Sequence, residues 1–339
     1  MSSDLGRRVL TVPGYILSFV LLIGLAPLFL PVLIVTDLVR RTPLALTRAF
    51  LFAIHYFACE VVGIAVSAWL WVRHRGFGKY DPERWIAAHY RLQWWWADTL
   101  LSGACFLFGL RIEVEGDDVV PRAGGPFHLL VRHVSVGDTL LAAVYLSRRH
   151  GHRLRYVLKR ELLWDPCLDI VGQRIPNCFV DRGGEDSEGE IARVRALAAD
   201  LGPSDGVLIY PEGTRFTPQR RAAVLEKLRR PGREELLARA ESLANVLPPR
   251  TGGTLALLDE RPDVDVVVCM HVGFDGTMRL TDLVSGALVG TTVRVRFDRI
   301  SADTIPRDEE GRTRWLFDLW SGVDRWVGEQ EREMQESAA

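Results

Sequence analysis

The chain contains one segment from which its fold class can be inferred, Phe127-His128-Leu129-Leu130-Val131-Arg132-His133-Val134-Ser135-Val136-Gly137-Asp138. Its apolar first half predicts a buried strand, and the polar second half predicts a turn leading into a helix. A step of five residues on one α-helix would leave His133 and Asp138 roughly 140° apart. They can therefore meet only if His133 lies on the loop or first turn before the helix and Asp138 lies one turn in. Gly137 would make such a bend easy.

In that geometry the carboxylate of Asp138 accepts a hydrogen bond from one ring nitrogen of His133 and leaves the other nitrogen basic. A nitrogen held in this way is suited to taking a proton from a hydroxyl. We interpret Ser135 as a turn former rather than a nucleophile. A His and an Asp at this spacing also occur by chance, so the interpretation depends on the rest of the chain.

Composition narrows the class of protein. The 339 residues carry a net charge of −1, which argues against nucleic-acid binding, and they are enough for one large domain or two smaller ones. The five cysteines are scattered without a C-x-x-C spacing, which predicts neither disulfides nor a metal site and fits a reducing compartment. The histidines are also dispersed, so we expect no metal and no resident cofactor.

The N-terminal part, residues 1–79, is predicted to be a membrane region. Residues 14–35 contain no charged side chain, and a helix of that length spans roughly 33 Å, about one hydrocarbon thickness. A second apolar run covers residues 49–72. The two runs predict a helical hairpin that either spans the bilayer or, because Pro27 and Pro31 interrupt the first run, lies bent in one leaflet.

Arg7 and Arg8 precede the first run and would also fit a cleaved signal peptide. The length of the run, its internal prolines and the lack of a small-residue cleavage site favour a retained helix. Basic residues are slightly more numerous at the outer ends of the hairpin than in its connecting loop. This bias predicts that the rest of the chain lies on the cytoplasmic side of the membrane.

Residues 80–330 are predicted to form one α/β domain with a mixed, largely parallel sheet flanked by helices, because short β-branched runs alternate with amphipathic segments. Residues 331–339 are expected to be frayed. The expected strands are 111–115, 127–131, 155–157, 178–180, 207–210, 264–270 and 292–297. The expected helices are 139–149, 186–201, 220–229, 234–243 and 313–329.

Two further strand ends carry polar residues. Pro211-Glu212-Gly213-Thr214-Arg215 follows a buried strand that the proline terminates, and Arg182 follows the strand at 178–180. Ligands bind at the carboxyl ends of strands in open α/β sheets, and an arginine there offers a planar fork for a phosphate. Taken alone, either motif fits an ordinary surface turn.

Together, these three blocks resemble the glycerolipid acyltransferases, the lysophosphatidic acid acyltransferase superfamily. His133 and Asp138 match the H-x-x-x-x-D block of that family, Phe179-Val180-Asp181-Arg182 matches the block whose arginine is assigned to the acceptor phosphate, and Glu212-Gly213-Thr214-Arg215 matches the E-G-T-R block. The resemblance covers roughly residues 97–297 and implies the glycerol-3-phosphate acyltransferase-like fold.

The resemblance implies acyl transfer from acyl-CoA or acyl carrier protein to the free hydroxyl of a lysophospholipid or of glycerol phosphate. The expected acceptor is 1-acyl-sn-glycerol-3-phosphate, giving phosphatidic acid. His133 would act as general base and Asp138 would orient it. The implied substrate-binding residues are Arg182, Glu212, Gly213, Thr214 and Arg215. The arginines would hold the phosphate, while Glu212 would orient Arg215 or bind a hydroxyl of the acceptor.

Other features leave alternatives open. The segment 247–253, after an Arg/Glu-rich insertion, resembles the branch with lysocardiolipin and lysophosphatidylinositol acyltransferases, so a remodelling acyltransferase or a transacylase on a larger head group is a second interpretation. A hydrolase and a non-catalytic membrane lipid-binding protein are others. Arg132 departs from the family pattern and could add a phosphate contact. The fourth block of the family appears only as the apolar run 266–271.

Overall fold

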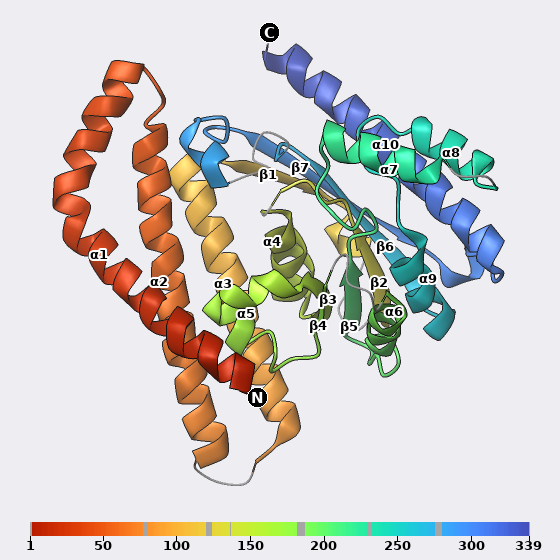
Figure 1. The fold of residues 1–339 in the computed structure, drawn as a ribbon, viewed down its shortest axis with the longest axis horizontal. Helices are drawn as coiled ribbons and strands as arrows, with labels where there is room; N and C mark the ends of the chain where they lie inside the picture. The colour runs from red at the N-terminus through yellow and green to blue at the C-terminus, as the bar shows by residue number, and fades with distance from the viewer. Residues whose placement is uncertain are drawn as a thin grey trace.

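The computed structural model describes residues 2–76, 80–119, 124–135, 137–181, 187–229, 232–274 and 280–338. Arg182 lies outside the described residues. A seven-stranded sheet forms the centre of the molecule, in the order β1-β7-β6-β2-β5-β3-β4 (Figure 1). Its strands are β1 (Arg111–Glu115), β2 (Phe127–Val131), β3 (Arg153–Lys159), β4 (Cys178–Val180), β5 (Asp205–Ile209), β6 (Asp265–Val272) and β7 (Thr292–Ile300).

All neighbouring strands run parallel except β6 and β7, which are antiparallel. The mixed, largely parallel sheet expected from the sequence is therefore confirmed. Strands β2 and β5 at its centre are buried along their whole length, which explains their continuous apolar sequence. The carboxyl ends of β2, β3, β4, β5 and β6 consequently meet at one edge of the sheet.

Helices cover both faces of the sheet. One hydrophobic core lies between the sheet and α3 (Pro82–Phe108) with α4 (Asp138–Ala142). The other lies between the sheet and α6 (Ser187–Ala196), α9 (Thr251–Glu260) and α10 (Glu309–Ala338). Trp320 of α10 is fully buried in this second core. The remaining short helices are α5 (Pro166–Ile170), α7 (Pro218–Leu228) and α8 (Glu234–Glu241).

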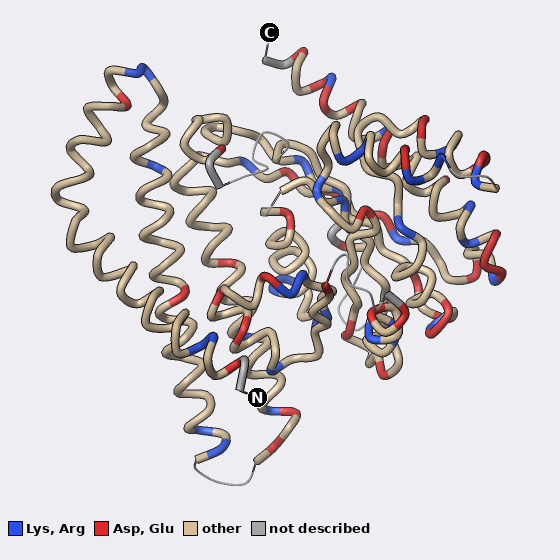
Figure 2. Tube along the Cα trace, in the orientation of Figure 1, with Lys and Arg blue, Asp and Glu red and all other residues tan. Residues whose placement is uncertain are grey.

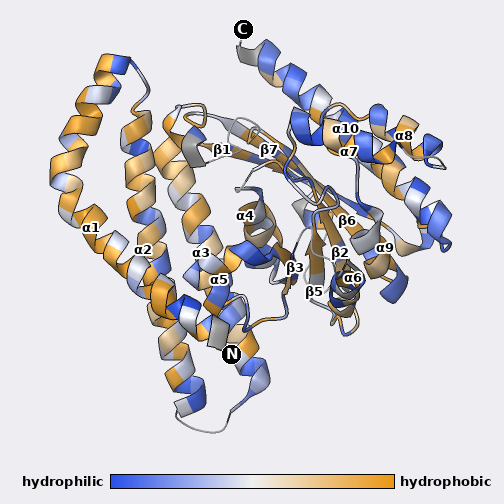
Figure 3. Cartoon of the chain, viewed as in Figure 1, coloured by the Kyte–Doolittle hydropathy of each residue, from blue (hydrophilic) through white to orange (hydrophobic). Residues whose placement is uncertain are grey.

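The two N-terminal apolar runs form the long helices α1 (Ser2–Arg40) and α2 (Ala45–Trp71). Both are apolar and long enough to be candidate membrane spans. Helix α2 packs between α1 and α3, so α1 is the outermost layer (Figure 1). Few charged residues lie along this three-helix layer (Figure 2), and most residues of α1 and α2 are hydrophobic (Figure 3). Helix α1 bends along its length, as expected for a helix with internal prolines.

Helix α1 is longer than the predicted segment 14–35 because its charged N-terminal turns are anchored. Arg7 and Arg8 both donate hydrogen bonds to the buried carboxylate of Asp169, with nitrogen–oxygen distances of 2.7 and 3.0 Å. A run of apolar residues predicts only the part of a helix that contacts lipid or the protein interior. The charged turns at the ends of the helix cannot be predicted in this way, because they are stabilised by residues far away in the sequence.

The expectation of a frayed tail at residues 331–339 was wrong, because α10 continues to Ala338. Glu333 forms an ion pair of 2.9 Å with Arg294 of β7, and Met334 packs against the second core. The predicted helix 139–149 also differs. It begins at Asp138 as α4 and continues as a π-helix over Ala143–Arg148. Helix α9 was not predicted, since its ten residues are short and begin with two glycines after Thr251.

Candidate active site

His133 and Asp138 form a contacting pair at the carboxyl end of β2. The Nδ1 atom of His133 lies 3.1 Å from Oδ2 and 3.3 Å from Oδ1 of Asp138. A carboxylate only accepts hydrogen bonds, so Nδ1 carries the proton and the other ring nitrogen, Nε2, is left with a free electron pair. The His133 side chain is 14% exposed while Asp138 is completely buried. The basic nitrogen belongs to the partly exposed member of the pair.

The backbone of the turn holds Asp138 in this position. Oδ2 of Asp138 accepts hydrogen bonds from the amides of Val134 at 2.8 Å and Ser135 at 3.0 Å. Burial by itself raises the pKa of this carboxyl, but His133 and the amides outweigh burial, so the net pKa lies below the ordinary value. Asp138 is therefore a stable anion beside His133.

The bend before Asp138 does not need the flexibility of glycine. Gly137 has a φ of −72°, which any L-residue adopts. A side chain there would only touch the Phe274 ring at an ordinary distance of 3.5 Å. Ser135 stabilises the turn by accepting a hydrogen bond from the Gly137 amide, in agreement with its interpretation as a turn former.

Glu212 connects the loops that follow β2 and β5. Its Oε1 atom accepts from the amide of His133 at 2.9 Å, and its Oε2 atom accepts from the amide of Leu247 at 3.0 Å. The side chain is 1% exposed. Both carboxylate oxygens of Glu212 are therefore bonded to backbone amides in the interior. This arrangement suits a residue that holds the backbone of His133 in place rather than one that binds a substrate hydroxyl. A second link joins the same loops, from the Phe216 amide to the His133 carbonyl at 3.0 Å.

The rest of the E-G-T-R block forms the surface beside the dyad. Gly213 has a φ of +68°, and the Arg250 side chain lies where a Cβ would project, so both conformation and space require glycine. Thr214 and Arg215 are half-buried. The Tyr210 ring, just before the block, stacks against His133 with ring centroids 4.3 Å apart. Tyr210 and Glu212 therefore both contact His133, which brings the ends of β2 and β5 together at this edge of the sheet.

Arg132 does not have the role suggested by its place before the histidine. Its side chain is 1% exposed and points into the protein, where Nη1 donates to the carbonyl of His271 at 2.6 Å and Nη2 donates to that of Asn245 at 3.2 Å. Glu331 of α10 lies 4.0 Å from the same guanidinium. A phosphate contact is excluded in this conformation. The apolar neighbours of Arg132 in the sequence gave no signal of this buried network.

The arginine block after β4 is only partly described. Asp181, the last described residue before Arg182, pairs with Arg160 at 2.8 Å at the carboxyl end of the sheet. Strand β4 is the edge strand, three positions from β2, which corresponds to roughly 14 Å across the sheet. Asp181 therefore lies at the same edge of the sheet as His133.

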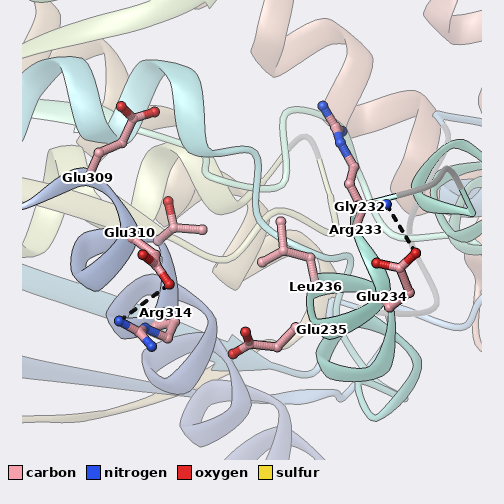
Figure 4. A pocket seen from close by; sticks show the side chains of 9 residues that line it. Gly232, Arg233, Glu234, Glu235, Leu236, Glu309, Glu310 and Arg314 are labelled. Atoms are coloured by element: carbon pink, nitrogen blue, oxygen red, sulfur yellow. Dashed lines mark hydrogen bonds and ion pairs between the residues drawn. The ribbon is translucent and has the colours of Figure 1, made fainter.

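Among the described residues, no group of three or more His, Cys, Asp and Glu side chains could hold a metal ion. A cavity of about 410 Å³ lies between the starts of α8 and α10 (Figure 4). Its lining is strongly charged, and its carboxylates Glu234 and Glu310 are partnered by the Gly232 amide and Arg314. None of its lining residues belongs to the loops that carry the dyad, and its charge does not suit an acyl chain.

Residues 111–255 match the family model of the acyltransferases. The chain is 25% identical over 229 residues to the mouse protein named 1-acyl-sn-glycerol-3-phosphate acyltransferase epsilon. The aligned region covers 64% of this chain and 60% of that protein. It thus spans under two thirds of that relative. The structure of the 1-acyl-sn-glycerophosphate (LPA) acyltransferase PlsC from Thermotoga maritima has a similar fold, with a TM-score of 0.55, 14% identity, and coverage of 85% of this chain and 98% of that one.

Titration of Glu212 is expected to make stability depend on pH. Burial raises the pKa of this carboxyl to about 7, although the two amide hydrogen bonds oppose the shift. Between about pH 4.5 and 7 the folded protein then binds more protons than the unfolded chain, so stability falls as pH rises. Relative to Glu212→Gln, the wild-type free energy of unfolding should fall by about 1–3 kcal/mol across this window.

Denaturant unfolding of both proteins in detergent at several pH values measures this difference. The glutamine variant loses one acceptor at every pH, which contributes a constant offset. A difference in unfolding free energy that stays the same from pH 4.5 to 7.5 would show that Glu212 does not titrate there.

Proposed function

We propose that the chain belongs to the glycerolipid acyltransferase superfamily and that it transfers a fatty acyl group from a thioester to the free hydroxyl of 1-acyl-sn-glycerol-3-phosphate, giving phosphatidic acid. The observation that carries the proposal is the His133–Asp138 pair at the carboxyl edge of the sheet, with one ring nitrogen of the histidine left basic. The names of the mouse relative and of the bacterial structure support this acceptor.

In the proposed reaction the acceptor hydroxyl oxygen attacks the carbonyl carbon of the thioester. Nε2 of His133 takes the hydroxyl proton as the carbon–oxygen bond forms. The tetrahedral intermediate then expels the thiolate as the carbon–sulfur bond breaks, and the imidazolium returns its proton to sulfur. Asp138 holds the tautomer and stabilises the imidazolium while it exists. The acceptor itself is the nucleophile, so no serine or cysteine is required.

The loop after β5 supplies the proposed acceptor site. Arg215 follows Gly213 and lies half-buried in a loop tied to His133 by the hydrogen bonds of Glu212 and Phe216. A guanidinium suits a phosphate because it presents several donors in one plane. Arg182 is proposed as a second phosphate ligand from the block after β4. Glu212 is proposed as a positioning residue, since both of its oxygens are already bonded to backbone amides.

We also propose that the protein binds one leaflet of a membrane, with α1 and α2 lying in the plane of that leaflet and the α/β domain on its cytoplasmic side. The acyltransferase domain touches α2 along nearly its whole length. Gly286 packs on Ala45 at one end, Tyr56 donates to Asp165 at 2.6 Å in the middle, and Arg174 donates to Ser67 at 2.8 Å near the other end.

Residues 45–67 of α2 extend over roughly 33 Å, about the thickness of the hydrocarbon core. A bilayer crossed by α2 along its axis would therefore immerse the charged residues of the domain that contact it. An in-plane orientation instead places only the apolar outer surface of α1 in lipid, where Leu10, Leu17 and Leu28 are exposed. The active site then remains within reach of lipid substrates at the surface.

His133→Ala should lower acyl transfer at least about a thousandfold, because the general base is lost. The assay uses detergent-purified protein, long-chain acyl-CoA and a panel of lysophosphatidic acid, glycerol-3-phosphate and lysophospholipids with larger head groups. His74→Ala is the control, since that histidine packs against Trp85 far along the chain from the dyad. Turnover retained by folded His133→Ala would overturn the mechanism, and faster turnover of a larger lysophospholipid would overturn the proposed acceptor.

Arg215→Ala should raise the KM for the phosphate-bearing acceptor about tenfold and change that for acyl-CoA little, because one charged hydrogen-bonding group is removed from the acceptor site. Arg229→Ala is the matched control, an exposed arginine paired with Glu226 beyond α7. Initial rates with each substrate varied in turn measure both constants. An effect confined to acyl-CoA would assign Arg215 to the donor instead.

Arg41→Cys tests the membrane orientation, because residue 41 lies in the turn between α1 and α2. In sealed vesicles an impermeant maleimide should label it from the same side as Arg229→Cys in the acyltransferase domain. The background carries Cys105→Ser, since the other four cysteines are buried. Labelling of the two sites from opposite sides would show that the hairpin crosses the bilayer.

A further inference from the structure

Another histidine lies in the interior next to the Asp138 carboxylate. His271, near the end of β6, is completely buried, and its Nε2 atom is 3.1 Å from the carbonyl oxygen of Arg132 and 3.8 Å from Oδ2 of Asp138. Because a carbonyl oxygen only accepts hydrogen bonds, Nε2 carries a proton. The positive end of this N–H group therefore lies next to the buried carboxylate that holds His133.

His271 and Arg132 bind one another in both directions. While the His271 ring donates to the Arg132 carbonyl, the Arg132 guanidinium donates to the His271 carbonyl at 2.6 Å. The Arg132 amide also donates to the carbonyl of Cys269 at 3.0 Å, which continues the β2–β6 pairing past the end of β2. Arg132, the residue directly before His133, is thus bonded to β6 through its carbonyl, its side chain and its amide.

We propose that His271 is a positioning residue for the His133–Asp138 dyad, which fixes the peptide before His133 and directs an N–H dipole at the Asp138 carboxylate. The proposal rests on the acyl-transfer function proposed above. It assigns a role to the residue that ends the fourth, divergent block of the sequence. His271 touches no reacting atom in this arrangement, and it acts through Arg132 and Asp138.

The charged and titratable groups around His271 come from several elements. Asp138 faces its ring from α4, and Arg132 contacts it from the end of β2. Arg132 in turn faces Glu331 of α10 and the buried Glu212 of the loop after β5. On the remaining side the Phe274 ring lies 6.0 Å away. Of these groups, Asp138 is the one that connects His271 to the catalytic base.

Loss of the His271 N–H group should change the protonation of His133 in one direction. The positive end of the dipole offsets part of the negative potential that Asp138 exerts at His133. Without it, the imidazolium form of His133 is favoured more strongly, so His133 stays protonated to a higher pH and cannot act as base. The acid limb of the pH–rate profile must then move upward.

His271→Leu should lower kcat about tenfold at neutral pH, as expected for the loss of one hydrogen bond that positions the base, with KM for both substrates within about threefold. The acid limb of kcat/KM should shift upward by about half a pH unit. His271→Gln should restore most of both losses, because its amide can donate to the same carbonyl.

His128→Leu is the matched control, a buried histidine on β2 that pairs with Val266 of β6 and whose neighbouring charges are Arg261 and Asp263. It should reduce thermal stability to a similar degree and leave the acid limb unchanged. His271→Leu with a wild-type acid limb, or His271→Gln as impaired as His271→Leu, would overturn the proposal.

A second measurement keeps this test independent of turnover. Nuclear magnetic resonance of protein labelled with ¹³C at histidine reports the titration of His133 directly, with its signal assigned by the His133→Ala variant. An upward shift of this titration in His271→Leu supports the proposal even where no acceptor is turned over, which would count against the proposed function alone. An unshifted titration in a folded variant overturns the role of His271.

Discussion

The buried carboxylate of Asp138 is the constraint on which the active site depends. A charge in a protein interior is tolerated only when hydrogen bonds and opposite charge replace water. Here the amides of Val134 and Ser135, the ring of His133 and the nearby N–H of His271 supply that replacement. The same bonds that compensate burial also determine the shape of the turn and the tautomer of the histidine.

Glu212 and Arg132 extend this arrangement to the rest of the fold. Glu212 ties the β2 loop to the β5 loop and to residue 247, while Arg132 ties it to β6, to Asn245 and to α10. Both side chains are buried, and their polar atoms bond mostly to backbone groups. Such fully connected polar networks restrict the conformations of the loops that they join. Arg132 and His133 are therefore held by bonds to several parts of the fold although they lie in a loop.

In the proposed orientation, the N-terminal helices attach the same domain to the membrane surface. Arg7 and Arg8 reach the buried Asp169 of α5, and α2 fits against the domain from Ala45 to Ser67. An apolar layer fixed in this manner leaves the outer face of α1 for lipid. In the proposed orientation, substrates that reside in the leaflet need not leave the surface to reach His133.

Local sequence patterns were enough to predict all seven strands, because buried parallel strands must be apolar. The polar turn after the second strand pointed to His133 and Asp138, but their spacing only allowed the contact that the structure shows. Only the tertiary structure shows the contacts of Arg132, Glu212 and His271, whose partners lie 35 to 199 residues away in the chain. Tertiary contacts also explain why the C-terminal residues are helical, because Glu333 pairs with Arg294 of β7 and Met334 packs against the second core. Periodicity records which face of an element is buried, but it does not record what a buried polar group meets there.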